Sequence, residues 1–140
     1  MAEGLFLHLI REREFDHQFE VDSAGTAGYH IGERPDHRMV ETAQSHGVNL
    51  PSNARQFTVS DFANYDVIVP MDDENVTNIE SLRPKHKTRA KVLKMRDFDD
   101  TDKGGNVPDP YYGGTGGFEE VFQLLLRSNS AFIDYLEKNS

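Results

Sequence analysis

The sequence predicts an α/β fold in which helices pack around a parallel sheet. Helical and extended patterns alternate along the chain in the order helix, strand, helix, strand, helix, strand, helix, as in sheets whose parallel strands are connected by helices. Residues 66–71 form an apolar run, as expected of a strand that is buried on both faces. Because no repeat or linker interrupts the sequence, we expect one domain over residues 1–140.

The first half of the chain contains two predicted helices and one predicted strand. The first helix begins beside Met1, because apolar residues recur after it at helical spacing. These residues are Leu5, Phe6, Leu9 and Ile10. Residues 19–23 alternate apolar and polar side chains, which predicts a short strand, and small residues at 23–28 form a turn after it. Pro35 opens the second helix, and Gly47 ends it.

The second half is predicted to contain two strands and two helices, preceded by a short helical turn. Thr58 suits the cap of that turn, which runs through Asp61 and Phe62. The predicted strands are residues 66–71 and 91–95, and the predicted helices are residues 72–82 and 117–136. The face of the helix at 72–82 that we expect to be buried carries Val76, Ile79 and Leu82. Residues 97–106 are expected to form a polar loop.

The composition limits the partners of the chain. Its formal net charge is −9, which repels phosphate backbones and anionic lipids, so we expect neither nucleic acid nor a membrane as partner, although a local basic patch could still bind an anion. No apolar run approaches the roughly 18 residues of a membrane span, and we expect a cytoplasmic protein. The chain has no cysteine, which excludes disulfides, thiolate metal sites and a cysteine nucleophile within it.

The sharpest functional motif is Asp109, which stands between Pro108 and Pro110 and is followed by Tyr111 and Tyr112. Its carboxyl group suits a general acid that protonates a leaving oxygen, provided that burial or a nearby anion raises its pKa. Exposed adjacent tyrosines favour a binding role, since such rings are costly on a surface unless they contact a ligand. The alternative is that Pro-Asp-Pro forms only a rigid turn before the last helix.

Two weaker motifs also have a structural alternative. The turn at 23–26 could present backbone N–H groups to an anion, or it could be an ordinary tight connection. Asp72, Asp73 and Glu74 could bind magnesium, but the favoured explanation is the start of a helix, where acidic residues suit the helix dipole. The six histidines show no metal-like spacing, so no metal site is predicted.

Taken together, short pieces along the whole chain resemble one known family. The pieces are residues 1–4, 22–26, 36–38, 47, 54–56, 61–62, 65–66, 71–72 with 75, and 109–113. In this order they are similar to the low-molecular-weight protein tyrosine phosphatases. The resemblance implies a flavodoxin-like open parallel sheet of four strands with helices on both faces.

The resemblance also implies an activity, which is hydrolysis of phosphotyrosine proteins or aryl phosphates without a cofactor. A cysteine thiolate attacks phosphorus, and the cysteinyl-phosphate is then hydrolysed by water. Asp109 matches the general acid of the family. Tyr29, Tyr111 and Tyr112 match positions that line the substrate cleft. Ser23, Asp72 and Asn75 match residues that support the phosphate-binding loop.

One part of the family pattern has no counterpart here. In the family, a strand and a loop of pattern C-x-x-x-x-x-R-S-P stand directly before the match to Met1, and they supply the nucleophile and the clamping arginine. We therefore expect an N-terminally truncated domain that lacks the first strand and is inactive as it stands. The strands near Phe19 and Asp66 would then expose unpaired edges. Lower stability, closure of the gap, or a strand-exchanged or edge-paired homodimer is expected to follow.

Three other functions remain open at this point. The first alternative is a non-catalytic binding module that keeps the aromatic cleft but hydrolyses nothing. An arsenate reductase of related fold is a second, although it too requires cysteines. A metal-dependent hydrolase built on Asp72 and Asp73 is a more distant third.

Overall fold

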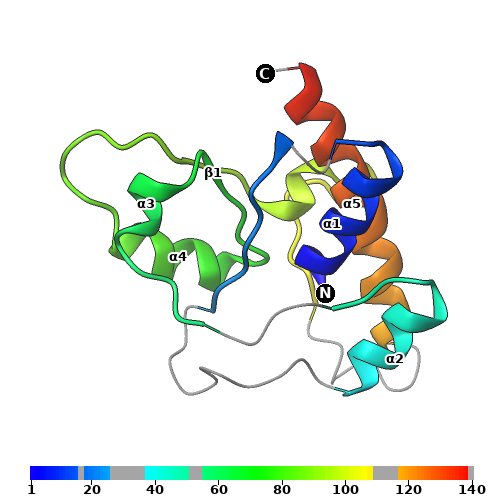
Figure 1. Cartoon of the computed structure of the whole chain (residues 1–140). Coiled ribbons are helices and arrows are strands. Elements are labelled where there is room, and N and C mark those ends of the chain that lie inside the picture. The colour runs from blue at the N-terminus through cyan, green and yellow to red at the C-terminus, as the bar shows by residue number, and fades with distance from the viewer. Residues whose placement is uncertain (16–17, 26–36, 51–54, 109–116, 139–140) are drawn as a thin grey trace.

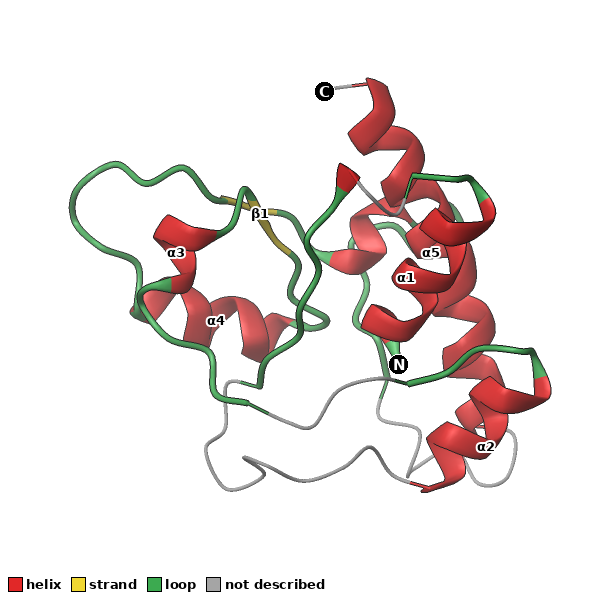
Figure 2. Ribbon diagram, viewed as in Figure 1, coloured by secondary structure: helices red, strands yellow, loops and turns green. Residues whose placement is uncertain are grey.

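The structure is a computed structural model that describes residues 1–15, 18–25, 37–50, 55–108 and 117–138 (Figure 1). Figure 2 shows that helices and loops make up most of these residues, with a short sheet between them. The elements are α1 (Ala2–Glu12), α2 (His37–Ser45), α3 (Asp61–Asn64), β1 (Val67–Ile68), α4 (Asp73–Ser81), β2 (Lys91–Val92), the 3-10 helix η3 (Met95–Phe98) and α5 (Gly117–Lys138).

The sheet pairs β1 and β2 in parallel, which confirms the direction expected for these two strands. Val67 lies opposite Lys91, and Ile68 lies opposite Val92. Backbone contact continues beyond the strands, since Met95 N–H donates to the carbonyl oxygen of Pro70 over 2.9 Å. Both strands are nevertheless shorter than predicted. Pro70 has no N–H to extend the ladder, and the chain turns into η3 at Met95.

Helices cover both faces of this sheet, which confirms the expected α/β arrangement. Val67 and Val69 pack with apolar residues of α1 and α5 on one face. Ile68 and Val92 pack against the buried side chains of α3 and α4 on the other face. Both strand residues of β1 are only half-buried, so the prediction of a strand buried on both faces is too strong.

The strand predicted at residues 19–23 is not formed in the structure. Phe19 and Val21 do pack against the α1 and α5 cluster, and the Phe19 ring meets the Phe6 ring edge-on at 5.6 Å between centroids. No residue of 19–23, however, bridges to a strand among the described residues, and the bridge that follows it joins Gly25 to Gln56. Alternation gives a segment one apolar face, but a strand also needs a neighbour for its backbone groups. In the described part of the chain, no such neighbour lies between this segment and β1.

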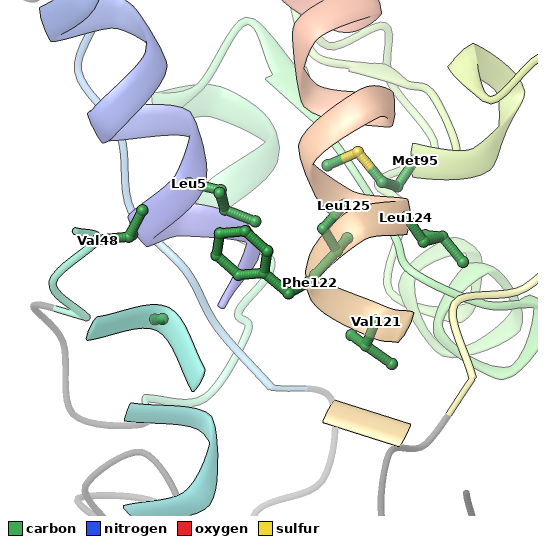
Figure 3. Close-up of a cluster of buried hydrophobic side chains, with 8 residues drawn as sticks. Leu5, Val48, Met95, Val121, Phe122, Leu124 and Leu125 are labelled. Carbon is green, nitrogen blue, oxygen red and sulfur yellow. The ribbon is translucent and has the colours of Figure 1, made fainter. Parts of the chain in front are cut away.

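The largest core cluster lies where α5 packs against α1 and α2 (Figure 3). Phe122 and Leu5, both almost fully buried, lie at its centre, and Val48 covers them from the chain that follows α2. Gly4 allows the close approach of α1 to this chain, because a Cβ there would lie 2.7 Å from Leu50 Cδ2. Gly47 follows α2 with a φ of +77°, as predicted for the residue that ends this helix.

Two further expectations differ from the structure. Leu82 is 44% exposed rather than buried, because α4 ends at Ser81 and Leu82 is its C-cap. The predicted polar loop at 97–106 begins inside η3. None of the helices in the described ranges is long and apolar enough to cross a bilayer.

Candidate functional site

The candidate site lies beyond the carboxyl ends of the extended segments. Met71 and Asp72 follow β1, and Ser23 precedes Gly25, whose backbone pairs with Gln56. In open α/β sheets, ligands bind at this end because the connecting loops converge there. The four predicted residues that would contact a substrate (Tyr29, Asp109, Tyr111 and Tyr112) lie outside the described residues.

The chain that leads to Asp109 is fixed to this end of β1. The Val107 N–H donates to the carbonyl oxygen of Met71 over 2.8 Å. The Asn106 side chain accepts a hydrogen bond of 3.0 Å from the Asp73 N–H. The Arg96 guanidinium donates to the Asn106 carbonyl oxygen over 2.8 Å. Two of these bonds hold residues 106–107 against the start of α4, and the bond from Arg96 ties Asn106 to η3.

A buried carboxylate anchors the preceding loop. Asp99 is fully buried and accepts hydrogen bonds from Arg96 (3.1 Å), Arg127 (2.9 and 3.2 Å) and the Thr101 hydroxyl (2.8 Å). Burial alone would raise the pKa of Asp99, but the bonds from Arg127 and Thr101 outweigh it and hold this pKa well below its usual range. The ionised carboxylate thus ties the loop after η3 to α5.

Asp72 and Asn75 come together as a reciprocal helix cap. Asp72 is the N-cap of α4, and its carboxylate accepts a hydrogen bond of 2.7 Å from the Asn75 N–H. The Asn75 side chain accepts in turn from the Met71 N–H over 3.2 Å. This arrangement satisfies backbone donors on both sides of the turn. It fixes the path of the chain as it leaves β1, where the carboxyl end of the strand faces the candidate site.

The geometry favours a structural role for Asp73 over the magnesium hypothesis. The Lys94 ammonium donates to the Asp73 carboxylate over 2.7 Å, and this bond lowers the pKa of Asp73. Asp72 is occupied by the helix cap described above. Within the described residues, no three His, Cys, Asp or Glu side chains converge on a point where a metal ion would fit. The acidic start of α4 is therefore explained by capping and by Lys94.

Ser23 is held from two sides. Its hydroxyl donates to the Glu3 carboxylate in the first turn of α1 over 2.8 Å. Its N–H donates to the carboxylate of Asp22 over 2.8 Å. The other oxygen of Asp22 accepts from Arg55 Nε over 2.7 Å. Ser23 therefore links the start of α1 to the bridge between Gly25 and Gln56.

Arg55 lies beside the Ser23 segment and binds it through Asp22, a contact that the sequence motifs do not predict. Its two terminal nitrogens donate to both oxygens of the buried Asp61 over 3.1 and 3.2 Å, while Nε binds Asp22. The bonds to Asp61 are the main reason that the pKa of Arg55 is raised, so it stays charged. Because all three guanidinium nitrogens of Arg55 donate to Asp22 or Asp61, Arg55 positions the Ser23 segment. Only its place in the resemblance, at 54–56, marked it in the sequence.

Comparison with known proteins places this geometry in a family. The sequence pattern of the family described as "Low molecular weight phosphotyrosine protein phosphatase" matches residues 1–140. A putative low molecular weight protein-tyrosine-phosphatase of Synechocystis is 44% identical over 126 residues, which cover 89% of this chain and 79% of that protein. The human low molecular weight phosphotyrosine protein phosphatase is 34% identical over 134 residues, covering 96% and 85% of the two chains.

Solved structures agree with this match. The protein tyrosine phosphatase of Entamoeba histolytica, with Hepes in its active site, superposes with a TM-score of 0.91 at 36% identity, covering 99% of this chain and 88% of that one. Bacillus subtilis YfkJ superposes with a TM-score of 0.88 at 31% identity, covering 99% and 86%. These likenesses confirm the flavodoxin-like fold. The chain therefore belongs to the low molecular weight phosphotyrosine protein phosphatase family.

Proposed function

We propose that the domain serves hydrolysis of phosphotyrosine in proteins, with Asp109 as the general acid. The observation that carries the proposal is the match of the family pattern to all of residues 1–140, which includes the Asp-Pro-Tyr-Tyr motif. The fixed position of Val107, two residues before Asp109, supports it. An acid must be held within hydrogen-bond reach of the leaving oxygen, and an anchored approach to Asp109 serves that requirement.

The proposed roles follow from the chemistry of an aryl phosphate. Its leaving group is a phenolate, which departs faster when Asp109 donates a proton to the bridging oxygen. Tyr29, Tyr111 and Tyr112 would contact the aromatic ring of the substrate, since ring-on-ring packing favours flat aryl groups. Ser23, Asp72 and Asn75 would hold the surrounding loops in place through the bonds described above.

We further propose that the chain by itself does not complete the reaction. Its 140 residues contain no cysteine, so no cysteinyl-phosphate is formed on it. The described arginines nearest the candidate site, Arg55 and Arg96, are bound to carboxylates and do not replace a phosphate clamp. A non-catalytic module that binds phosphotyrosine without hydrolysing it is the alternative function, and the same lack of cysteine favours it.

Hydrolysis assays on two proteins test the proposal. One is the chain as it stands. The other, called the extended chain below, carries the first strand and the phosphate loop of the human relative in front of Met1. We expect no turnover of phosphotyrosine by the first and clear turnover by the second. Turnover by the chain alone that survives purification contradicts the proposed inactivity, and an extended chain that folds but hydrolyses no aryl phosphate contradicts the proposed function.

The substrate class needs its own comparison, because one structural relative is described as a Drosophila arginine phosphatase (26% identity, TM-score 0.87, covering 96% of this chain and 87% of that one). We propose the aryl ester, since Tyr29, Tyr111 and Tyr112 match sequence positions that line the substrate cleft in the family. The extended chain is expected to hydrolyse phosphotyrosine faster than phosphoarginine. A reversed preference contradicts this assignment and leaves the general phosphatase proposal intact.

We also propose that the open edge of β1 pairs with a second copy of the chain. The bonds to β2 use the backbone of residues 66, 68 and 70, so alternate residues Val67 and Val69 direct their N–H and C=O groups to the other side. In the described part of the chain, no backbone group bonds to that side. Sedimentation over a range of concentrations should show a dimer. A cooperative monomer as stable as a family member with all four strands would contradict it.

A further inference from the structure

The segment from residue 82 to residue 96 has a charge opposite to that of the rest of the chain. It contains seven of the 15 Lys and Arg residues and none of the 24 Asp and Glu residues. The remaining residues therefore carry eight basic side chains against 24 acidic ones. The protein is an anionic molecule with a single strongly cationic segment, and such a segregated charge creates a local positive potential.

Most of this charge lies on one exposed loop. The basic loop is defined here as residues 83–91, which lead from the end of α4 to the first residue of β2. Its basic side chains, all exposed, are Arg83, Lys85, His86, Lys87, Arg89 and Lys91. Figure 1 shows the loop as the wide yellow-green turn that projects from the side of the molecule formed by α3 and α4. The charges are thus presented to solvent on a projecting turn.

Three of the five Lys and Arg side chains of the basic loop have no acidic partner within the described residues. Arg83 pairs with Glu80 and Arg89 pairs with Asp66, both over 2.6 Å at the surface. No ion pair within the described ranges involves Lys85, Lys87 or Lys91. Three like charges on one short loop repel one another unless an external anion neutralises them. The loop is therefore electrostatically complementary to an anion from outside the chain.

Two of the described residues have large exposed hydrophobic side chains. They are Val59, which is 53% exposed, and Leu82, which is 44% exposed. Leu82 directly precedes the basic loop. Val59 belongs to the turn that opens α3, since its carbonyl oxygen accepts from the Phe62 N–H. The Arg83 guanidinium lies over the Phe62 ring at 5.3 Å and thereby joins α3 to the loop. Leu82 thus adjoins the basic loop directly, and the turn that carries Val59 is connected to it through Phe62 and Arg83.

The basic loop lies at the opposite end of the sheet from the candidate site. Because β1 and β2 are parallel, the loop enters β2 at its amino end, whereas Met71 and Asp72 follow the carboxyl end of β1. A partner bound to the loop would therefore leave the candidate site open. The surface is independent of the function proposed above.

We propose that the basic loop, together with Leu82 and Val59, is a docking surface for a short acidic segment of another protein that carries apolar residues among its Asp and Glu. A long polyanion or an anionic membrane is too large to contact the loop alone and would also approach the rest of the molecule. That remainder has three times as many acidic as basic residues and repels an anionic partner. A short peptide contacts the loop alone. At physiological salt, charges more than about 8 Å away are screened, so the local positive charge decides the interaction.

Fluorescence anisotropy with a labelled peptide of sequence Glu-Glu-Leu-Glu-Glu-Leu-Glu-Glu tests the proposal. The protein is the chain as it stands, and the test variant combines Lys85→Glu, Lys87→Glu and Lys91→Glu. The matched control combines Arg11→Glu, Lys103→Glu and Lys138→Glu, which changes three exposed basic residues elsewhere and gives the same net charge. We expect the test variant to lose about tenfold or more in affinity, and the control to change about twofold at most. Affinity should fall as salt rises.

Three results would overturn the proposal. An equal loss in both variants would show that only total charge matters. Absence of peptide binding to the unchanged chain would remove the site. Tighter binding of phosphatidylserine vesicles or duplex DNA than of the peptide would assign the loop to a different partner. Amide NMR shifts on adding the peptide supply a readout without mutation, and they should concentrate at residues 82–91 and 59. Shifts confined to other residues would contradict the assignment.

Discussion

The Val107 N–H donates a hydrogen bond of 2.8 Å to the carbonyl oxygen of Met71, which ties the approach to Asp109 to the carboxyl end of β1. In the extended chain, Val107→Pro removes this donor and Val107→Ala keeps it. Because a displacement of about 1 Å at a catalytic group costs about 100-fold in rate, we expect kcat to fall about 10- to 100-fold in Val107→Pro. Steady-state hydrolysis of phosphotyrosine measures this. Equal kcat values for the two variants would show that the bond does not position Asp109.

The buried carboxylate of Asp99 should contribute more to the stability of the fold than its exposed neighbours in the same loop. Asp99→Asn removes the charge that Arg96 and Arg127 bind, and hydrogen bonds to charged groups contribute about 1.5 to 3 kcal/mol each. We therefore expect a loss of about 2 to 3 kcal/mol in the free energy of unfolding, measured in urea at neutral pH. The control is Asp100→Asn, a change of the exposed neighbour, which should have an effect below about 0.5 kcal/mol.

The same pair of variants predicts a pH dependence. The pKa of Asp99 is lowered in the folded protein, so its contribution is complete above the ordinary aspartate pKa of about 4. It is lost as the pH falls from there through the lower folded value. The difference in stability between the unchanged chain and Asp99→Asn should therefore shrink between pH 5 and pH 3. A difference that stays constant over this range would contradict the ionised state assigned to Asp99.

Arg55→Lys should weaken the segment that carries Ser23. A lysine retains the charge but cannot donate simultaneously to Asp22 and to both oxygens of Asp61. Asp61 is buried, so an unmet acceptor there costs about 1 to 3 kcal/mol in the free energy of unfolding. Arg89→Lys alters an exposed pair with Asp66 and should cost less than about 1 kcal/mol. Urea unfolding of the two variants side by side checks the prediction, which fails if both lose the same amount.

Asp72 distinguishes helix capping from metal binding. Asp72→Ala should destabilise the chain by about 1 to 2 kcal/mol, because the Asn75 N–H loses its acceptor. Asp72→Asn should cost only a few tenths, since asparagine caps as well as aspartate. Thermal unfolding with and without millimolar Mg²⁺ completes the test. Stabilisation by Mg²⁺ that disappears in Asp72→Asn would restore the magnesium hypothesis.

The helices follow from local patterns more fully than the strands do. In α1 and α5, apolar residues recur at helical spacing, and each helix satisfies most of its backbone within itself. Residues 19–23 have the alternation of a strand, but a strand depends on a neighbour that no local pattern specifies. The start of α4 could be predicted because its acidic residues at 72–74 are adjacent in the sequence, as the first turn of a helix requires.

The ionic anchors of the site could not be predicted in the same way. Asp99 and Arg127 are 28 residues apart, and each stands in a stretch whose charges resemble those of a solvated surface. Burial of Asp99 decides its importance, and burial of a single carboxylate follows from tertiary packing. The same holds for Leu82. Its helical spacing predicts burial, but α4 ends at Ser81, and Leu82 is therefore exposed to solvent.

The general acid role of Asp109 is tested most directly by comparing two leaving groups in the extended chain and in its Asp109→Asn variant. Phenyl phosphate releases a strongly basic phenolate, whereas p-nitrophenyl phosphate releases a weakly basic one that needs less protonation. We expect Asp109→Asn to lower kcat for phenyl phosphate by about 100- to 10,000-fold, with a much smaller effect on p-nitrophenyl phosphate and little change in inhibition by inorganic phosphate. Equal losses for both substrates, or none, would contradict the assignment of Asp109 as the proton donor.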